Sequence, residues 1–117
     1  MTKQRYDKHS TEFGIWTRNQ KLIDSSLGFV ATNIDYIWRN YKTKKWMLIE
    51  EKRYMGVPRF WQEEIFDILD RSCKTDVNYC GFYLIQFEKT NPDDGKIYIN
   101  KKLVTKDYLL EFLQFKI

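Results

Sequence analysis

The stretch NIDYI at residues 33–37, followed after a short basic loop by MLIEEK at residues 47–52, decides how this chain is interpreted. Both segments are rich in branched and aromatic residues and predict two strands of an antiparallel hairpin. Because strand side chains alternate between faces, Glu50 and Lys52 point the same way. Carboxylates seldom occur within apolar strands unless they are paired or bind a metal. We therefore expect Asp35, Glu50 and Lys52 to converge at one point.

Turn and cap signals outside this hairpin predict an α/β (α+β) fold. A helix between the third and fourth strands implies a crossover connection, so the sheet should be mixed. A hairpin strand and a helix should follow the core. The expected order is a helix from about Ser10 or Thr11, strands near 28–31, at 33–40 and at 46–54, a helix at 58–73, a strand at 79–88, a hairpin strand at 96–100 and a helix capped by Thr105.

The 117 residues predict one domain over 1–117, with residues 1–8 as a flexible tail. The composition, 43% hydrophobic and 17% aromatic, is typical of a globular protein. No apolar run approaches the roughly 18–20 residues that span a bilayer, so no membrane association is expected. The polar start of the chain does not resemble a signal peptide, which predicts a cytoplasmic location. Cys73, Cys80 and the single histidine, His9, are too few for a four-ligand zinc site.

The acids and the lysine of the hairpin are the residue types that a magnesium site for phosphodiester hydrolysis needs. Mg²⁺ prefers oxygen ligands, often one or two carboxylates with water and substrate phosphate. Asp35 and Glu50 would supply the carboxylates, and the backbone carbonyl of Glu51 a further ligand. The ion would activate a bound water, which Lys52 would orient or deprotonate, or Lys52 would neutralise the developing charge. Mn²⁺ is expected to substitute for Mg²⁺.

The acid-x-lysine pattern alone is weak, since about two matches are expected from this composition. The second match, Asp94-Gly95-Lys96, lies in a turn signal, where Asp and Gly have an ordinary structural role. Only the match at Glu50 and Lys52 falls on a predicted strand. The alternative for these residues is the solvated face of an edge hairpin with cross-strand ion pairs.

On these residues the chain resembles the PD-(D/E)xK nuclease superfamily, in particular its small phage-type, RecB-like and resolvase-like members. The resemblance covers about residues 10–88 and rests on Asp35 and on the Glu50 to Lys52 motif. It implies a restriction-endonuclease-like αβββαβ core with a catalytic metal site. Ile34 stands where many members have proline.

The resemblance also implies two further site residues. Glu12 lies in the first helix, where many members carry an acid that helps hold a metal, although a glutamate there also suits the helix dipole. Gln62 opens the helix after the motif, where members often carry a polar active-site residue, although an exposed helix residue is the somewhat favoured reading. Separately, Lys42, Lys44 and Lys45 at the hairpin tip could contact phosphates, although solvated loop lysines are common.

The expected function is a divalent-metal-dependent deoxyribonuclease acting on DNA, with branched or recombination intermediates as candidate substrates and a homodimer as the candidate assembly. If the chain is phage-encoded, the location would be the host cytoplasm. Two alternatives use the same fold without catalysis. One is a nucleic-acid-binding module, whose affinity would fall steeply with salt. The other is an interaction or assembly component of a phage.

Overall fold

The computed structural model describes residues 11–117, which divide into two units, 11–31 and 32–117. The expected flexible tail at 1–8 lies outside the described residues. Because the two units are described separately, the expectation of one domain over the whole chain stays a prediction.

The first unit is a short helical segment. Helix α1 spans Glu12–Arg18 and is capped by Thr11, whose Oγ1 accepts a hydrogen bond from the Gly14 amide at 3.1 Å. Two 3₁₀ turns follow, Lys21–Ile23 and Ser25–Leu27. The strand expected near 28–31 is wrong, because these residues form no strand. Gly28 has a left-handed backbone, φ 98°, that ends the second turn.

The second unit is built on one five-stranded mixed sheet, ordered β1-β2-β3-β4-β5. Strand β2 pairs antiparallel with β1 and parallel with β3, and the β3–β4 and β4–β5 pairs are antiparallel. This arrangement confirms the expected mixed sheet. The strands are β1 (Tyr36–Arg39), β2 (Trp46–Lys52), β3 (Tyr79–Phe87), β4 (Ile97–Ile99) and β5 (Lys102–Val104).

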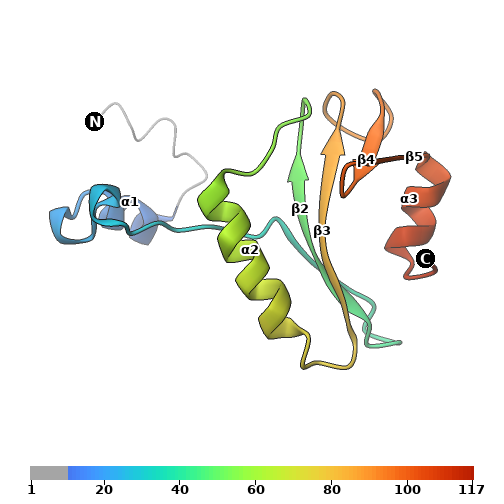
Figure 1. The fold of residues 1–117 in the computed structure, drawn as a ribbon, viewed down its shortest axis with the longest axis horizontal. Helices are drawn as coiled ribbons and strands as arrows, with labels where there is room; N and C mark the ends of the chain where they lie inside the picture. Colours follow the sequence, from blue (N-terminus) through green and yellow to red (C-terminus); the bar gives the residue numbers. More distant parts are fainter. Residues whose placement is uncertain (1–10) are drawn as a thin grey trace. The chain divides into compact units, whose positions relative to one another are not determined.

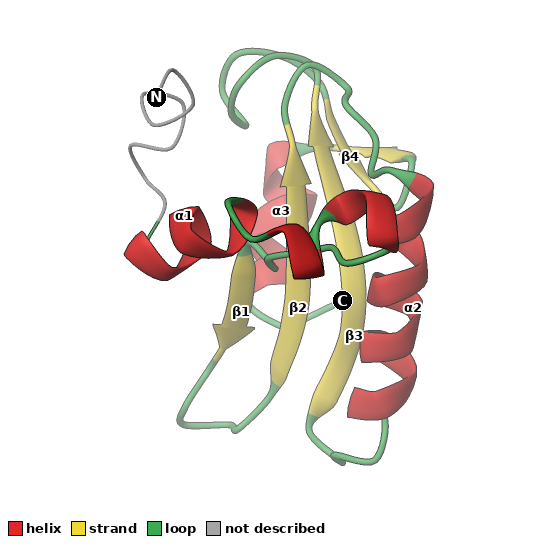
Figure 2. Cartoon of the chain, turned by 90° about the vertical axis from the view of Figure 1, so that its left-hand side faces the viewer, coloured by secondary structure: helices red, strands yellow, loops and turns green. Residues whose placement is uncertain are grey.

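A helix covers each face of this sheet (Figure 1). Helix α2, Phe60–Cys73, forms the crossover between β2 and β3, and its Phe66 ring packs on Phe82 with 4.7 Å between centroids. Helix α3, Lys106–Leu113, covers the opposite face, as the rotated view in Figure 2 also shows. The buried core is formed on the α3 side by Met47, Ile49, Ile85, Phe87, Ile97, Ile99, Leu109 and Phe112.

The strands around the hairpin are shorter than the sequence predicts. β1 begins at Tyr36 and β2 ends at Lys52, so only two strands precede α2 in the described residues. The strand β5 was not expected. The fold is therefore a mixed α+β fold with three α-helices and five strands in residues 11–117. None of the described helices is long and apolar enough to cross a membrane.

Candidate metal and phosphodiester site

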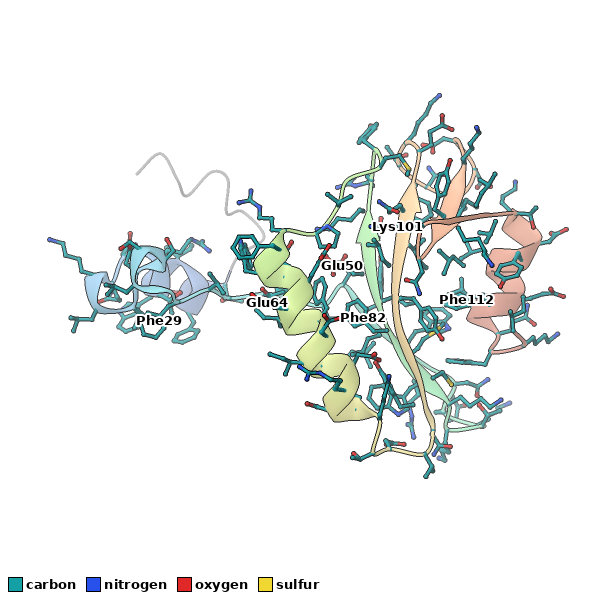
Figure 3. The ribbon with its side chains drawn as sticks, in the orientation of Figure 1. Phe29, Glu50, Glu64, Phe82, Lys101 and Phe112 are labelled. Carbon is teal, nitrogen blue, oxygen red and sulfur yellow. The ribbon has the colours of Figure 1, made fainter. Side chains whose placement is uncertain are left out.

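Glu50 and Lys52 lie at the end of β2, on the sheet face that α2 covers. Glu50 is paired in register with Leu84 of β3 and Lys52 with Gln86. Figure 3 shows Glu50 projecting into the space between β2 and α2. The Lys52 Nζ lies 3.3 Å from Glu50 Oε2. Both side chains therefore share one face, as strand alternation predicts, and they form an ion pair.

Asp35 reaches the same end of β2 from the bend immediately before β1. Tyr36 is opposite Ile49, so the preceding residue is level with Glu50. The Asp35 Oδ2 accepts a hydrogen bond from the backbone N–H of Glu51 at 2.8 Å. If β1 were longer, a backbone carbonyl of β1 would accept this hydrogen bond from Glu51, and here the Asp35 carboxylate accepts it instead. The hydrogen bond holds the Asp35 carboxylate beside Glu50.

Strand geometry also places the backbone carbonyl of Glu51 on the β1 side of β2. In an antiparallel ladder a residue's N–H and C=O face the same neighbouring strand, and the Glu51 N–H faces Asp35. The Glu51 side chain lies on the opposite face, where its Oε1 accepts a hydrogen bond from the Tyr36 hydroxyl at 3.1 Å. That hydrogen bond to Glu51, with its negative charge, raises the pKa of Tyr36.

Glu50 is a buried carboxylate with an incomplete set of partners. Its residue surface is 4% exposed, and its Oε1 has no hydrogen-bond partner among the described residues. Burial raises the pKa of Glu50, and the negative charge of Asp35 raises it further, whereas the ion pair with Lys52 lowers it in part. A buried acceptor without a partner destabilises the fold unless a ligand completes it. A cation bound between Glu50 and Asp35 would supply the missing partner.

The raised pKa predicts that Glu50→Gln stabilises the metal-free protein, and more so as the pH rises. A carboxyl whose folded pKa exceeds its unfolded value stabilises the fold at low pH and loses that contribution as pH rises through the folded pKa. Urea unfolding in EDTA should show a free-energy gain over wild type that grows between pH 5 and pH 8. Glu51→Gln, on the other face, is the control. A gain that does not change with pH would contradict this account of Glu50.

Two predicted site residues lie on helices. Gln62 is in the first turn of α2, where its Oε1 accepts a hydrogen bond from the Arg59 backbone N–H at 2.9 Å, so it has a capping role. Glu12 is in the first turn of α1, in the other unit. A catalytic role for Gln62 or for Glu12 stays a prediction.

The basic hairpin loop does not lie beside the acids. Lys42, Lys44 and Lys45 precede β2, whereas Glu50 is near its end, and Figure 1 shows the two ends of this strand far apart. Lys45 precedes Glu50 by five positions along the strand, which is roughly 16 Å at about 3.3 Å per residue. This separation could have been read from the hairpin itself, because the loop and the motif lie at opposite ends of one strand.

The second acid-x-lysine match has the expected turn role. Asp94 accepts hydrogen bonds from the Thr90 hydroxyl and backbone N–H and from the Asn91 N–H. The hydrogen bond from the Thr90 hydroxyl lowers the pKa of Asp94. Because its carboxylate accepts these hydrogen bonds within the turn, Asp94 is not positioned to bind a metal ion together with another acid.

The sequence analysis did not identify Tyr36, Arg53 and Gln86, which lie near the candidate site. Asp35, Tyr36, Glu51 and Arg53 line a cavity of about 260 Å³. On the other face Gln86, which is 3% exposed, donates from Nε2 to the Gly56 carbonyl at 2.9 Å. Arg53 follows the motif directly and could have been noticed as a cation at its end. Nothing in the sequence indicated the role of Gln86.

Comparison of the chain with protein-family models, with curated proteins and with solved structures found no match.

Proposed function

We propose that this protein is a divalent-metal-dependent nuclease that hydrolyses phosphodiester bonds of DNA. The observation that carries the proposal is the buried Glu50 carboxylate, which lies beside the carboxylate of Asp35 and the ammonium of Lys52 and whose Oε1 has no hydrogen-bond partner within residues 11–117. A purely structural ion pair would not need a second acid held at the same point. Two acids and a lysine at the end of a strand also match the resemblance to the PD-(D/E)xK superfamily, whose restriction-endonuclease-like fold is part of the proposal.

The donor set fits Mg²⁺ or Mn²⁺. Asp35 and Glu50 would provide two carboxylates, and the Glu51 backbone carbonyl, on the β1 side of β2, is the proposed third ligand. Within residues 11–117 no cluster of three or more histidine, cysteine or acidic side chains could hold a metal alone, which disfavours a closed structural zinc site. Mg²⁺ commonly uses one or two carboxylates and keeps the remaining positions for water and substrate phosphate. When bound, such an ion makes a water more acidic and offsets charge on the phosphate.

Lys52 is the residue proposed to act on the reacting groups. Its side chain is 24% exposed, so the ammonium can be reached by a substrate, whereas its Glu50 partner is 5% exposed. From this position the ammonium can donate a hydrogen bond to the attacking water or to a phosphate oxygen that gains charge. Donors fixed in advance stabilise the charge that develops in the transition state. Glu50 holds Lys52 in place before substrate binds.

The test is a cleavage assay with circular, linear, branched and single-stranded DNA, each with Mg²⁺, Mn²⁺ or EDTA. Products that require the metal and disappear in Glu50→Gln would support the proposal. If neither ion produced cleavage of any substrate, the proposal would be wrong. Salt-sensitive binding without turnover would then favour the non-catalytic binding module.

A further inference from the structure

The loop after β2, residues 53–59, leaves the sheet at the same end as Lys52 and leads into α2 (Figure 1). It is fixed to the neighbouring strand by three hydrogen bonds. The Tyr54 N–H donates to the Lys89 carbonyl at 2.8 Å and the Met55 N–H to the Phe87 carbonyl at 2.9 Å. Gln86 Nε2 donates to the Gly56 carbonyl at 2.9 Å. This loop therefore has a defined conformation next to the candidate site.

The conformation exposes an aromatic side chain. Tyr54 and Met55 both have left-handed backbones, with φ 53° and 55°. Residues other than glycine rarely adopt this region, and it persists only where surrounding contacts impose it. The imposed geometry leaves Tyr54 69% exposed and not packed against the core. An exposed ring two residues after Lys52 is available for contact with a ligand.

The loop also presents two exposed cations. Arg53 and Arg59 are both exposed, and neither forms an ion pair in the part of the chain that the structure describes. Arg53 lines the cavity that also contains Asp35 and Glu51. A guanidinium matches the geometry of a phosphate group, to which it can donate two parallel hydrogen bonds. The loop thus combines phosphate-binding groups with an open aromatic face.

We propose that residues 53–59 bind a single-stranded segment of DNA beside the bond that is cut. Arg53 and Arg59 contact its phosphates, and the ring of Tyr54 stacks on an unpaired base. The position of the cut relative to the loop rests on the proposed nuclease function. Stacking on a side chain requires a base whose face is open, and in a duplex each base face is covered by its neighbours. This surface therefore selects unpaired DNA, whereas a row of lysines would supply charge without that selection.

Fluorescence anisotropy with a labelled 20-nucleotide thymidine oligomer and a blunt 20-base-pair duplex tests this surface. The full chain is titrated in EDTA, so binding is measured without cleavage. Tyr54→Ala is expected to weaken binding of the oligomer by at least about fivefold. Binding of the duplex should change less than about twofold, and Tyr54→Phe should bind the oligomer like wild type because it keeps the aromatic face.

Tyr41 provides a matched control, because it is also 69% exposed but lies in the lysine loop at the other end of the hairpin. Tyr41→Ala should leave oligomer binding unchanged. Thermal unfolding of each variant checks that the fold is intact, and Tyr54→Leu, which keeps the bulk, should lose affinity like Tyr54→Ala. Equal binding by Tyr54→Ala and wild type, or an equal loss for oligomer and duplex, would overturn the inference.

The two proposals fail in different ways. Metal-dependent cleavage together with oligomer binding that does not depend on Tyr54 would contradict the single-strand surface alone. Tyr54-dependent binding without cleavage of any DNA would contradict hydrolysis and retain the surface.

Discussion

Replacing Lys52 with methionine is expected to slow metal-dependent cleavage by about 10²–10³-fold, as for loss of one fixed donor to a developing charge. Methionine keeps the length and apolar stem of the side chain but removes the ammonium that lies 3.3 Å from Glu50. The metal ligands remain, so Mn²⁺ should still bind. Single-turnover cleavage at saturating protein measures the effect without a contribution from product release.

The chain contains its own control for this variant. Lys96 ends the second acid-x-lysine match, next to a turn in which Asp94 is already hydrogen-bonded. Lys96→Met should cleave at the wild-type rate. Equal rates for Lys52→Met and wild type would exclude Lys52 from the chemistry, and equal losses in both lysine variants would indicate an effect of charge alone.

Replacing Asp35 with asparagine is expected to weaken metal binding by at least about tenfold, since even residues that only support metal ligands have effects of this size. Asparagine retains an oxygen that can accept the hydrogen bond from the Glu51 N–H, so β1 and β2 should stay in register. What is lost is one negative charge at the proposed metal position. Calorimetric titration with Mn²⁺ measures the change, and cleavage should fall with it.

Asp93→Asn is the matched control for Asp35→Asn. Asp93 is an exposed acid whose ion-pair partner, at 3.0 Å, is Lys106 of α3. Its replacement should leave Mn²⁺ affinity unchanged. If Asp35→Asn bound Mn²⁺ as tightly as wild type, the role of Asp35 as a ligand would be contradicted.

The elements that could be predicted from the sequence are those whose signals are local. Helix α2 has an apolar face at helical spacing, and β3 is a continuous apolar run, typical of a strand buried on both faces. Thr11 and Thr105 are capping residues, and both accept hydrogen bonds from backbone N–H groups of the helices that follow. Strand alternation likewise predicted that Glu50 and Lys52 share a face.

The elements that could not be predicted depend on tertiary contacts or unusual backbone. Strand β5 follows a turn in which Asn100 and Lys101 have left-handed φ values of 48° and 69°. Lysine gives no signal for such a turn, so the connection was not recognised. The expected strand near 28–31 has suitable residues, but propensity alone does not produce a strand without a partner.

Only Asp35, Glu50 and Lys52 of the predicted site residues are brought together, and their geometry could not be predicted from the sequence. Asp35 lies before β1 and not within it, and it is positioned by one hydrogen bond to the Glu51 backbone. That contact depends on the register of the hairpin, which no local pattern specified. The loop with Tyr54 was not foreseen for the same reason, because its backbone is held by the carbonyls of Phe87, at the end of β3, and of Lys89, just after it.

Anomalous diffraction from crystals grown with Mn²⁺ tests the central claim most directly. We expect one manganese ion held jointly by the carboxylates of Asp35 and Glu50, with Oε1 of Glu50, which has no hydrogen-bond partner in the described part of the chain, among its ligands. The Glu51 carbonyl oxygen should lie within bonding distance of the ion, as the third ligand from the protein. Manganese bound only elsewhere, or no ordered ion at this position at saturating Mn²⁺, would contradict the account.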